Sequence, residues 1–280
     1  MRDVLNAITI DVEDWFHICD IESILPPSKW DRCESRVEKN VAKILGILSE
    51  RRVFGTFFVL GYVAQRLPQV IRMIAHEGHE IACHGFGHIQ VYKMTPDEFA
   101  IDLTRSKKVI QEVSGGQVIG YRAPEWSIRK GPRSSLWALP ILASQGFRYD
   151  SSIAPLRIIG IPKAPRTPYI IATEHGVIEE FPPLVKRSWA GNLPVGGGWG
   201  LRVFPYGMIR GAIRELNGHG IPAVIFLHPS DFDPDPPDIP LPLVKRFVCR
   251  GKIKGTEERV QRLLDEFRFG PIREIYGDSL

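Results

Sequence analysis

Two histidines, His84 and His88, stand four residues apart directly after the apolar run Ile81–Cys83. Histidine is the commonest side-chain ligand of zinc-like metals, and a catalytic site uses about three protein ligands with one position open. The intervening Gly85 and Gly87 each weaken a helix by about 1 kcal/mol, so we expect the pair on a loop. The two histidines are therefore predicted to supply two of the about three protein ligands of a metal site.

An acidic cluster of Asp11, Glu13 and Asp14 closes the first apolar run, Ala7–Ile10. Three neighbouring carboxylates repel one another unless a cation neutralises them, although a solvated helix N-terminus is an alternative interpretation. Because side chains alternate along a strand, Glu13 is expected on the same face as Asp11. The cluster is therefore the candidate source of a third ligand.

Two further polar residues follow apolar runs. Arg122 follows the run that ends at Tyr121, and His228 follows the run that ends at Leu227. The carboxyl ends of parallel strands gather at one mouth, where ligands bind. We therefore expect both to meet the histidine pair, although alone Arg122 could be a structural ion-pair partner and His228 a satisfied core histidine.

Short apolar runs alternate with helical patterns, which is typical of α/β folds built around a parallel sheet. Strands are predicted at residues 7–10, 54–60, 80–83, 117–121, 146–150, 177–181 and 223–227. Helices are predicted at residues 37–48, 63–77, 95–113, 134–144, 206–217 and 256–269. With no internal repeat and no clean domain boundary, the sequence favours one α/β barrel.

The bulk properties narrow the function classes. A net charge of +4 without a basic run interleaved with aromatics argues against nucleic-acid binding, while an anionic carrier or membrane surface stays open. No apolar run reaches the ~18 residues of a membrane helix, and the first strand starts too early for a signal peptide. The four cysteines form no C-x-x-C pair and suggest reduced thiols. We therefore expect a cytoplasmic protein, with peripheral membrane attachment left open.

Five motifs occur in a recognisable order: Thr9-Ile10-Asp11 to Asp14, His84 to His88, Tyr121-Arg122-Ala123-Pro124, Tyr149-Asp150-Ser151-Ser152 and Leu227-His228. In this order they resemble the polysaccharide deacetylase family, which is carbohydrate esterase family 4 or the NodB homology domain. The resemblance implies a distorted (β/α)7 TIM-like barrel over residues 1–230. The stretch from Asn192 through Gly196-Gly197-Gly198-Trp199 to Pro271 resembles the C-terminal extension of a bacterial subgroup linked to exopolysaccharide and exosortase loci. Residues 231–280 are expected to form an extension that packs on the barrel.

The same resemblance implies a divalent metal, with Zn²⁺ the expected ion, held by one carboxylate and by His84 and His88. It implies that Asp11 is the general base, that Arg122 holds it, and that His228 is the general acid. Asp150 would orient His228.

The sequence departs from the family pattern in places that affect these roles. Val12 and Glu13 separate Asp11 from Asp14, so the third ligand is Asp14 or Glu13; the family's ligand type narrowly favours Asp14. The backbone N–H of Glu125 is expected to stabilise the oxyanion. Trp126 or Trp199 would supply a surface on which a sugar stacks, although core packing explains Trp199 equally well.

These observations predict a metal-dependent hydrolase that removes N-acetyl groups from a sugar in a polysaccharide, oligosaccharide or lipid-linked precursor. Two alternatives stay open. One is an allantoinase- or imidase-like C–N hydrolase on the same barrel, and the other is a non-catalytic glycan-binding relative.

Overall fold

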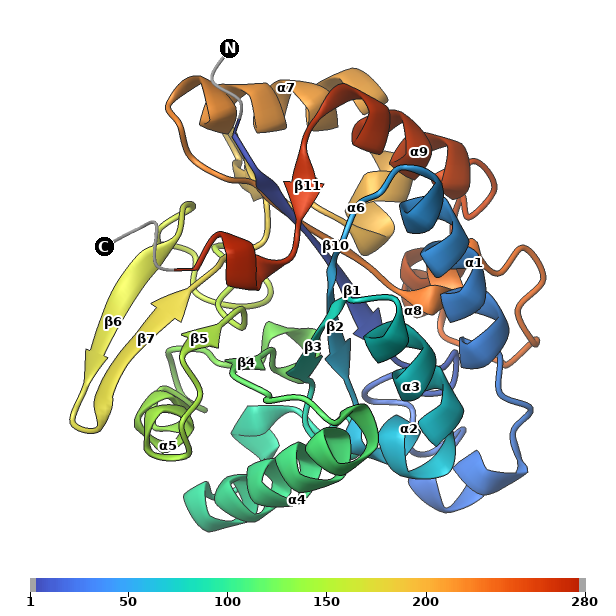
Figure 1. Ribbon diagram of the computed structural model, residues 1–280, viewed down its shortest axis with the longest axis vertical. Coiled ribbons are helices and arrows are strands. Elements are labelled where there is room, and N and C mark those ends of the chain that lie inside the picture. Colours follow the sequence, from blue (N-terminus) through green and yellow to red (C-terminus); the bar gives the residue numbers. More distant parts are fainter. Residues whose placement is uncertain (1–3, 277–280) are drawn as a thin grey trace.

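The computed structural model describes residues 4–276 and contains a nine-stranded sheet that curls into a half-barrel (Figure 1). The strands of this sheet are β1 (Asn6–Val12), β2 (Thr56–Val59), β3 (Glu80–Cys83), β4 (Gly120–Tyr121), β5 (Tyr149–Asp150), β6 (Tyr169–Thr173), β7 (Gly176–Glu180), β10 (Val224–Leu227) and β11 (Phe269–Gly270). A separate hairpin joins β8 (Lys186–Ser188) to β9 (Gly191–Leu193).

The helices are α1 (Val37–Glu50), α2 (Gly61–Arg66), α3 (Pro68–His76), α4 (Pro96–Ser114), α5 (Ala138–Ser144), α6 (Gly198–Val203), α7 (Tyr206–Gly218), α8 (Leu243–Arg250) and α9 (Thr256–Glu266). In Figure 1, helices α1, α3 and α4 lie along the outside of the curled sheet, next to β1, β2 and β3.

Seven parallel strands lie side by side in the order β10-β1-β2-β3-β4-β5-β7, and the antiparallel β6 follows at the edge. Within residues 4–276, β6 does not pair with β10, so the sheet curls without closing into a full barrel. The predicted α/β class with a TIM-like arrangement of about seven strands is confirmed.

Burial explains why the parallel strands are apolar on both faces. All seven residues of β1 and all four of β2, β3 and β10 are buried, because helices cover one face and the barrel interior fills the other. The predicted helix start at Thr95 is confirmed by a capping box, in which Thr95 accepts from the Glu98 N–H and Glu98 from the Thr95 N–H.

The structure differs from the predicted elements in three ways. The predicted helix 63–77 is two helices, because Pro68 cannot continue the hydrogen-bond ladder and instead begins α3. Strands β6, β8, β9 and β11 and helices α6 and α8 were not predicted, since they are short and mostly half-exposed or lie among glycines and prolines. The predicted helix 256–269 ends at Glu266, and its last predicted residue, Phe269, begins β11.

The C-terminal extension contributes to the sheet. Its strand β11 pairs in parallel with the start of β1, through Asn6 with Phe269 and Ala7 with Gly270. The predicted division at residue 230 stays a prediction. All four cysteines are free, and no helix among residues 4–276 is long and apolar enough to cross a membrane.

Candidate active site

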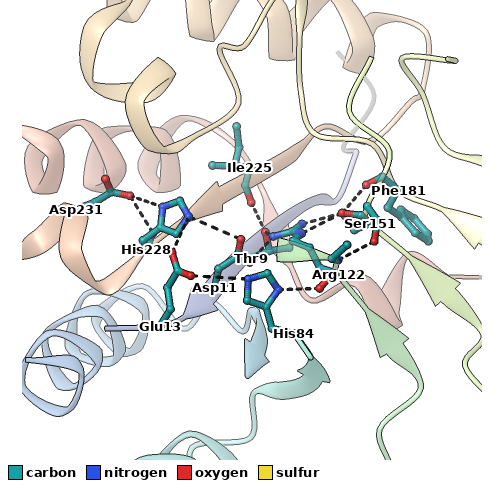
Figure 2. Close-up of polar contacts among 12 residues, drawn as sticks. Thr9, Asp11, Glu13, His84, Arg122, Ser151, Phe181, Ile225, His228 and Asp231 are labelled. Carbon is teal, nitrogen blue, oxygen red and sulfur yellow. Dashed lines mark hydrogen bonds and ion pairs between the residues drawn. The ribbon is translucent and has the colours of Figure 1, made fainter. Parts of the chain in front are cut away.

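The end of β1 carries a buried ion pair. Arg122, which follows β4, lies with Nη1 2.7 Å from the Asp11 carboxylate and also donates to the hydroxyl of Thr9. Its other nitrogens donate to Ser151 (Figure 2). Its guanidinium also lies over the ring of Phe58. Five fixed contacts leave Arg122 little freedom, so Asp11 is held in one position.

This pair determines the charge of Asp11. Burial raises the pKa of its carboxyl, but the positive charges of Arg122, then of His84 and His228, outweigh burial and hold the pKa below its ordinary value. Asp11 is therefore ionised at neutral pH.

Glu13, His84 and His88 form a second group beside Asp11. One ligand atom from each lies within 4.8 Å of the others. The closest approach, 2.5 Å, joins His88 Nε2 to Glu13 Oε2, and His84 Nε2 lies 4.0 Å from the same oxygen. Figure 2 shows Glu13 and His84 pointing toward each other from β1 and from the loop after β3.

His84 has the protonation state that a metal ligand needs. Its Nδ1 lies 2.7 Å from the backbone carbonyl of Arg122, so Nδ1 carries the proton and the lone pair of Nε2 faces Glu13. Burial lowers the pKa of His84 to about 4, which keeps the imidazole neutral at physiological pH.

The buried oxygen Oε2 of Glu13 faces two imidazole nitrogens. It lies 2.5 Å from His88 Nε2 and 4.0 Å from His84 Nε2, and neither contact has hydrogen-bond geometry. Buried carboxylate oxygens normally have hydrogen-bond partners. A buried oxygen whose close neighbours are two imidazole nitrogens fits a divalent cation, and a nitrogen–nitrogen–oxygen donor set suits zinc.

His88 is held from the opposite side by a thiol. Its Nδ1 lies 3.4 Å from Sγ of Cys19, and its backbone is left-handed with a φ of 54°. Burial lowers the pKa of His88, but the negative charge of Glu13 and the contact with Cys19 outweigh burial and raise the pKa well above its ordinary value. In the absence of a metal, His88 and Glu13 therefore form an ion pair.

Asp14, the narrowly preferred third ligand, does not join this group. Its carboxylate accepts hydrogen bonds from the Ser35 hydroxyl and from the backbone N–H groups of Arg36 and Trp15. These contacts hold the chain just before α1, and burial raises the pKa of Asp14. Asp14 therefore lies outside the group that Glu13, His84 and His88 form, and Glu13, the alternative candidate, is the third ligand that we propose.

His228 completes the site from the end of β10. Its Nε2 lies 3.6 Å from Glu13 and 3.9 Å from Asp11. Burial opposes protonation, but the hydrogen bond to Asp231 and the charges of Glu13, Asp231 and Asp11 outweigh it and raise the pKa of His228 to about 9. His228 is thus a cation at neutral pH and faces the ligand group.

Asp231 orients His228, a role that the sequence analysis missed. Its Oδ2 lies 3.3 Å from His228 Nδ1 and accepts from the His228 backbone N–H, while Oδ1 lies 3.1 Å from Nε of the buried Arg202. The available signal was an aspartate three residues after the histidine in a turn that begins with Pro229.

Asp150, to which that role was assigned, lies elsewhere. It accepts from the Ser152 hydroxyl and lies against Glu180 at the end of β7. Burial raises the pKa of Asp150 to about 6, and burial together with Asp150 raises that of Glu180 further. Asp150 therefore does not orient His228; it shares a buried acid pair behind Arg122.

Glu125 and Trp126 form a strained turn next to the site. Both have left-handed backbones, with φ of 52° and 48°, which costs free energy in non-glycine residues. Gln90 donates to the Glu125 carboxylate at 2.7 Å, and the Trp126 ring packs edge-on against Phe226. The oxyanion role of the Glu125 N–H and a sugar contact by Trp126 stay predictions.

Trp199 packs edge-on against Phe204 and Phe247, and a sugar contact by Trp199 stays a prediction. The glycine run before Trp199 approaches the site. A Cβ on Gly198 would lie 3.3 Å from Cε1 of His228, so only glycine lets this backbone approach the imidazole.

A small cavity of about 50 Å³ lies beside the ligand group. His88 forms part of its wall, and the segment between β1 and α1 supplies His17 and Trp30. Lys93 and Gln90 add polar groups. The arrangement gives a solvent-connected space next to the candidate metal centre.

Two histidines and a carboxylate lie at the mouth of an α/β half-barrel, with an ionised aspartate and a protonated histidine beside them. Residues 29–141 match the family model described as polysaccharide deacetylase, and residues 151–277 match a domain of unknown function (DUF3473). The chain therefore contains a region similar to the polysaccharide deacetylase family. Membership of the exopolysaccharide-associated subgroup stays a prediction.

Named relatives agree with this assignment. A peptidoglycan-N-acetylglucosamine deacetylase of Bacillus cereus is 33% identical over 73 residues, which are 26% of this chain and 26% of that protein. A chitooligosaccharide deacetylase of Rhizobium leguminosarum bv. trifolii is 32% identical over 101 residues, or 36% of this chain and 43% of that protein. The chain thus spans less than half the length of these curated relatives.

A solved structure covers more of the chain. The crystal structure of a proposed polysaccharide deacetylase from Mycobacterium smegmatis is 27% identical. It matches 98% of this chain and 89% of its own, with a TM-score of 0.64. The similarity therefore includes the region beyond the deacetylase model.

Proposed function

We propose that this protein is a metal-dependent hydrolase that removes the N-acetyl group from an N-acetylated sugar of a glycan. The observation that carries the proposal is the convergence of the Glu13, His84 and His88 ligand atoms between an ionised Asp11 and a protonated His228. A base, an acid and a ligand group at one mouth are what amide hydrolysis needs.

Glu13, His84 and His88 would hold the cation, for which zinc suits the donor set. A divalent ion bound there lowers the pKa of a water ligand and polarises the acetamide carbonyl. Asp11 is placed to accept a proton from the attacking water, and Arg122 keeps Asp11 ionised and oriented. The backbone N–H of Glu125 is proposed to donate to the developing oxyanion.

His228 would supply the second proton. As the amide C–N bond breaks, the water oxygen stays on the acyl carbon and the imidazolium protonates the departing amine. The products are acetate and a free amino sugar. Asp231 holds the imidazole in place through Nδ1, which leaves Nε2 to face the reacting group.

The substrate class rests on the named relatives, which act on peptidoglycan or chitooligosaccharide. The small cavity beside His88 would lie next to the bound sugar, and the half-buried aromatic ring of Trp126 is the proposed stacking surface. Whether the glycan is a polymer, an oligosaccharide or a lipid-linked intermediate stays a prediction, as does a cytoplasmic location.

The test is acetate release from chitooligosaccharides by the full chain. The protein is stripped with a chelator, assayed, and assayed again after zinc is restored. We expect acetate release to be lost and then recovered, because without the cation nothing lowers the pKa of the attacking water or polarises the acetamide carbonyl.

Two results would contradict the proposal. Activity that survives complete chelation would exclude the metal-dependent mechanism. Ring opening of allantoin without acetate release would favour the alternative C–N hydrolase, and tight glycan binding with no turnover in zinc would favour a binding protein.

A further inference from the structure

Helix α8 presents an apolar stripe to solvent. Leu243, Val244, Phe247 and Val248 lie one helical turn apart in two pairs and are 84%, 76%, 47% and 42% exposed. They are four of the twelve large hydrophobic side chains exposed among residues 4–276, and α8 contains no buried residue. Surface helices of globular proteins ordinarily turn their apolar stripe inward.

The cationic side of α8 faces the protein instead. Lys245 donates to the backbone carbonyl of Cys19 and lies 3.9 Å from Asp20, while Arg250 lies 2.9 Å from Asp238. Arg202, buried beneath the helix, donates to its last carbonyls, including that of Gly251 at 2.8 Å. These polar contacts hold α8 in the orientation that turns its apolar stripe outward, so the exposure of the stripe follows from the packing of the helix.

The charge around the stripe indicates what covers it. Residues 239–256 contain five lysines and arginines and neither aspartate nor glutamate. Arg246, Lys252 and Lys254 are exposed. An apolar stripe bordered by cations matches an anionic lipid surface, in which the stripe enters the acyl boundary and the cations meet the headgroups. A second copy of this chain would instead oppose its own positive charges across the contact.

The helix also lies at the rim of the candidate site. Cys19, whose carbonyl Lys245 binds, contacts His88 through its thiol. Arg202 joins the end of α8 to Asp231, which orients His228. A surface that binds α8 therefore lies near the entrance to the site.

We propose that α8 docks this protein on an anionic membrane surface, with Leu243, Val244, Phe247 and Val248 inserted and the exposed cations Arg246, Lys252 and Lys254 at the headgroups. The inference does not depend on the deacetylase activity, because it concerns partitioning of the whole protein onto lipid.

The experiment measures co-sedimentation of the full chain with vesicles of equal parts phosphatidylglycerol and phosphatidylcholine. Binding is expected to weaken when phosphatidylglycerol is left out, and to fall at about 0.5 M salt. The double variant L243S/V244S should partition at least about tenfold more weakly. K252Q/K254Q should weaken binding to the anionic vesicles by about fivefold for each cation removed.

The matched control is Ile101→Ser, which removes a 68% exposed aliphatic side chain from α4. It should leave partitioning unchanged, and thermal unfolding should show that all variants fold, since every changed side chain is exposed. Absence of wild-type binding, or equal binding by L243S/V244S, would overturn the proposal. So would a wild-type dimer that L243S/V244S converts to a monomer, because a second copy would then cover α8.

Discussion

Two pairs of buried carboxylates lie on either side of Arg122, and they have opposite properties. Asp11 and Glu13 have lowered pKa values, whereas Asp150 and Glu180 have raised ones. Burial raises the pKa in both pairs, so burial does not distinguish them.

The charged groups around each pair explain the difference between their pKa values. The first pair faces three imidazoles and a guanidinium, so it stays charged and leaves Glu13 Oε2 open for a cation. The second pair faces itself, and two carboxyls in contact cannot both ionise cheaply. A buried acid therefore indicates a metal centre only where unsatisfied ligand atoms and cations converge on it; otherwise it keeps a proton.

The sharpest test of this contrast is Glu13→Gln. Replacing a ligand carboxylate with a neutral amide should lower zinc affinity by at least about a hundredfold and reduce acetate release below detection. Metal content after dialysis and calorimetric titration with zinc measure the effect.

Asp14→Asn is the matched control, since it changes the adjacent carboxylate. It should keep the metal and lose about 1 kcal/mol of stability, because Asp14 satisfies backbone donors at the start of α1. Loss of zinc in D14N with retention in E13Q would restore Asp14 as the ligand.

The next largest effect is expected at His228, the proposed general acid beside the ligand group. His228→Gln should reduce acetate release by roughly a hundredfold or more while zinc content stays unchanged. Asp231→Asn should give a smaller loss, because the imidazole remains but loses its oriented partner. Steady-state rates and metal analysis on the same samples separate this role from ligation. An H228Q rate close to that of the wild type would refute the assignment.

The smallest effect on activity is expected at the second pair. Asp150→Asn should keep activity within a few-fold of the wild type, because Asp150 contacts neither His228 nor the ligand group. Its effect should appear in stability against pH, measured by urea unfolding between pH 4 and 7.

The direction in which stability changes with pH follows from the raised pKa of Asp150. Asp150 has a pKa of about 6 in the fold against an ordinary 3.8, so the folded state binds the extra proton. The stability that this proton contributes is complete below pH 4 and is lost as pH rises through about 6. D150N should therefore gain roughly 1 to 3 kcal/mol relative to the wild type across this range. Substitution of the exposed Asp235 by Asn should show no such trend. If the stability of D150N changed with pH in parallel with that of the wild type, the result would argue against a protonated Asp150–Glu180 pair.

The sequence was sufficient to predict members of the candidate site where a single structural rule fixes the position of a residue. Polar residues that directly follow buried parallel strands must meet at one edge of the sheet, so His84, Arg122 and His228 were predicted together from placement alone. Their strands are short, apolar and fully buried, and this is the pattern that periodicity identifies most clearly.

The sequence was insufficient where the role of a residue depends on the direction of its side chain or on contacts with residues far away in the chain. Alternation favoured Glu13, yet the resemblance favoured Asp14, and only the contacts of Asp14 with Ser35 and Arg36 separate them. Arg202 reaches Asp231 from another element, so no local pattern indicates that pair. Helix α8 escaped prediction because prolines precede it and its apolar stripe faces solvent.

The pairing of β1 has a consequence for how the site is assembled during synthesis. Its partner β2 emerges from the ribosome early, but β10 and β11 come from the far end of the sequence. A nascent chain therefore holds its central strand with one edge unpaired until these late segments appear, a state in which apolar strands are prone to aggregate. Asp11 lies on that strand and Glu13 directly after it, while His228 and Asp231 arrive with the late segments. The complete site is thus one of the last parts of the molecule to form, and a chaperone that shields the edge of β1 would raise its yield.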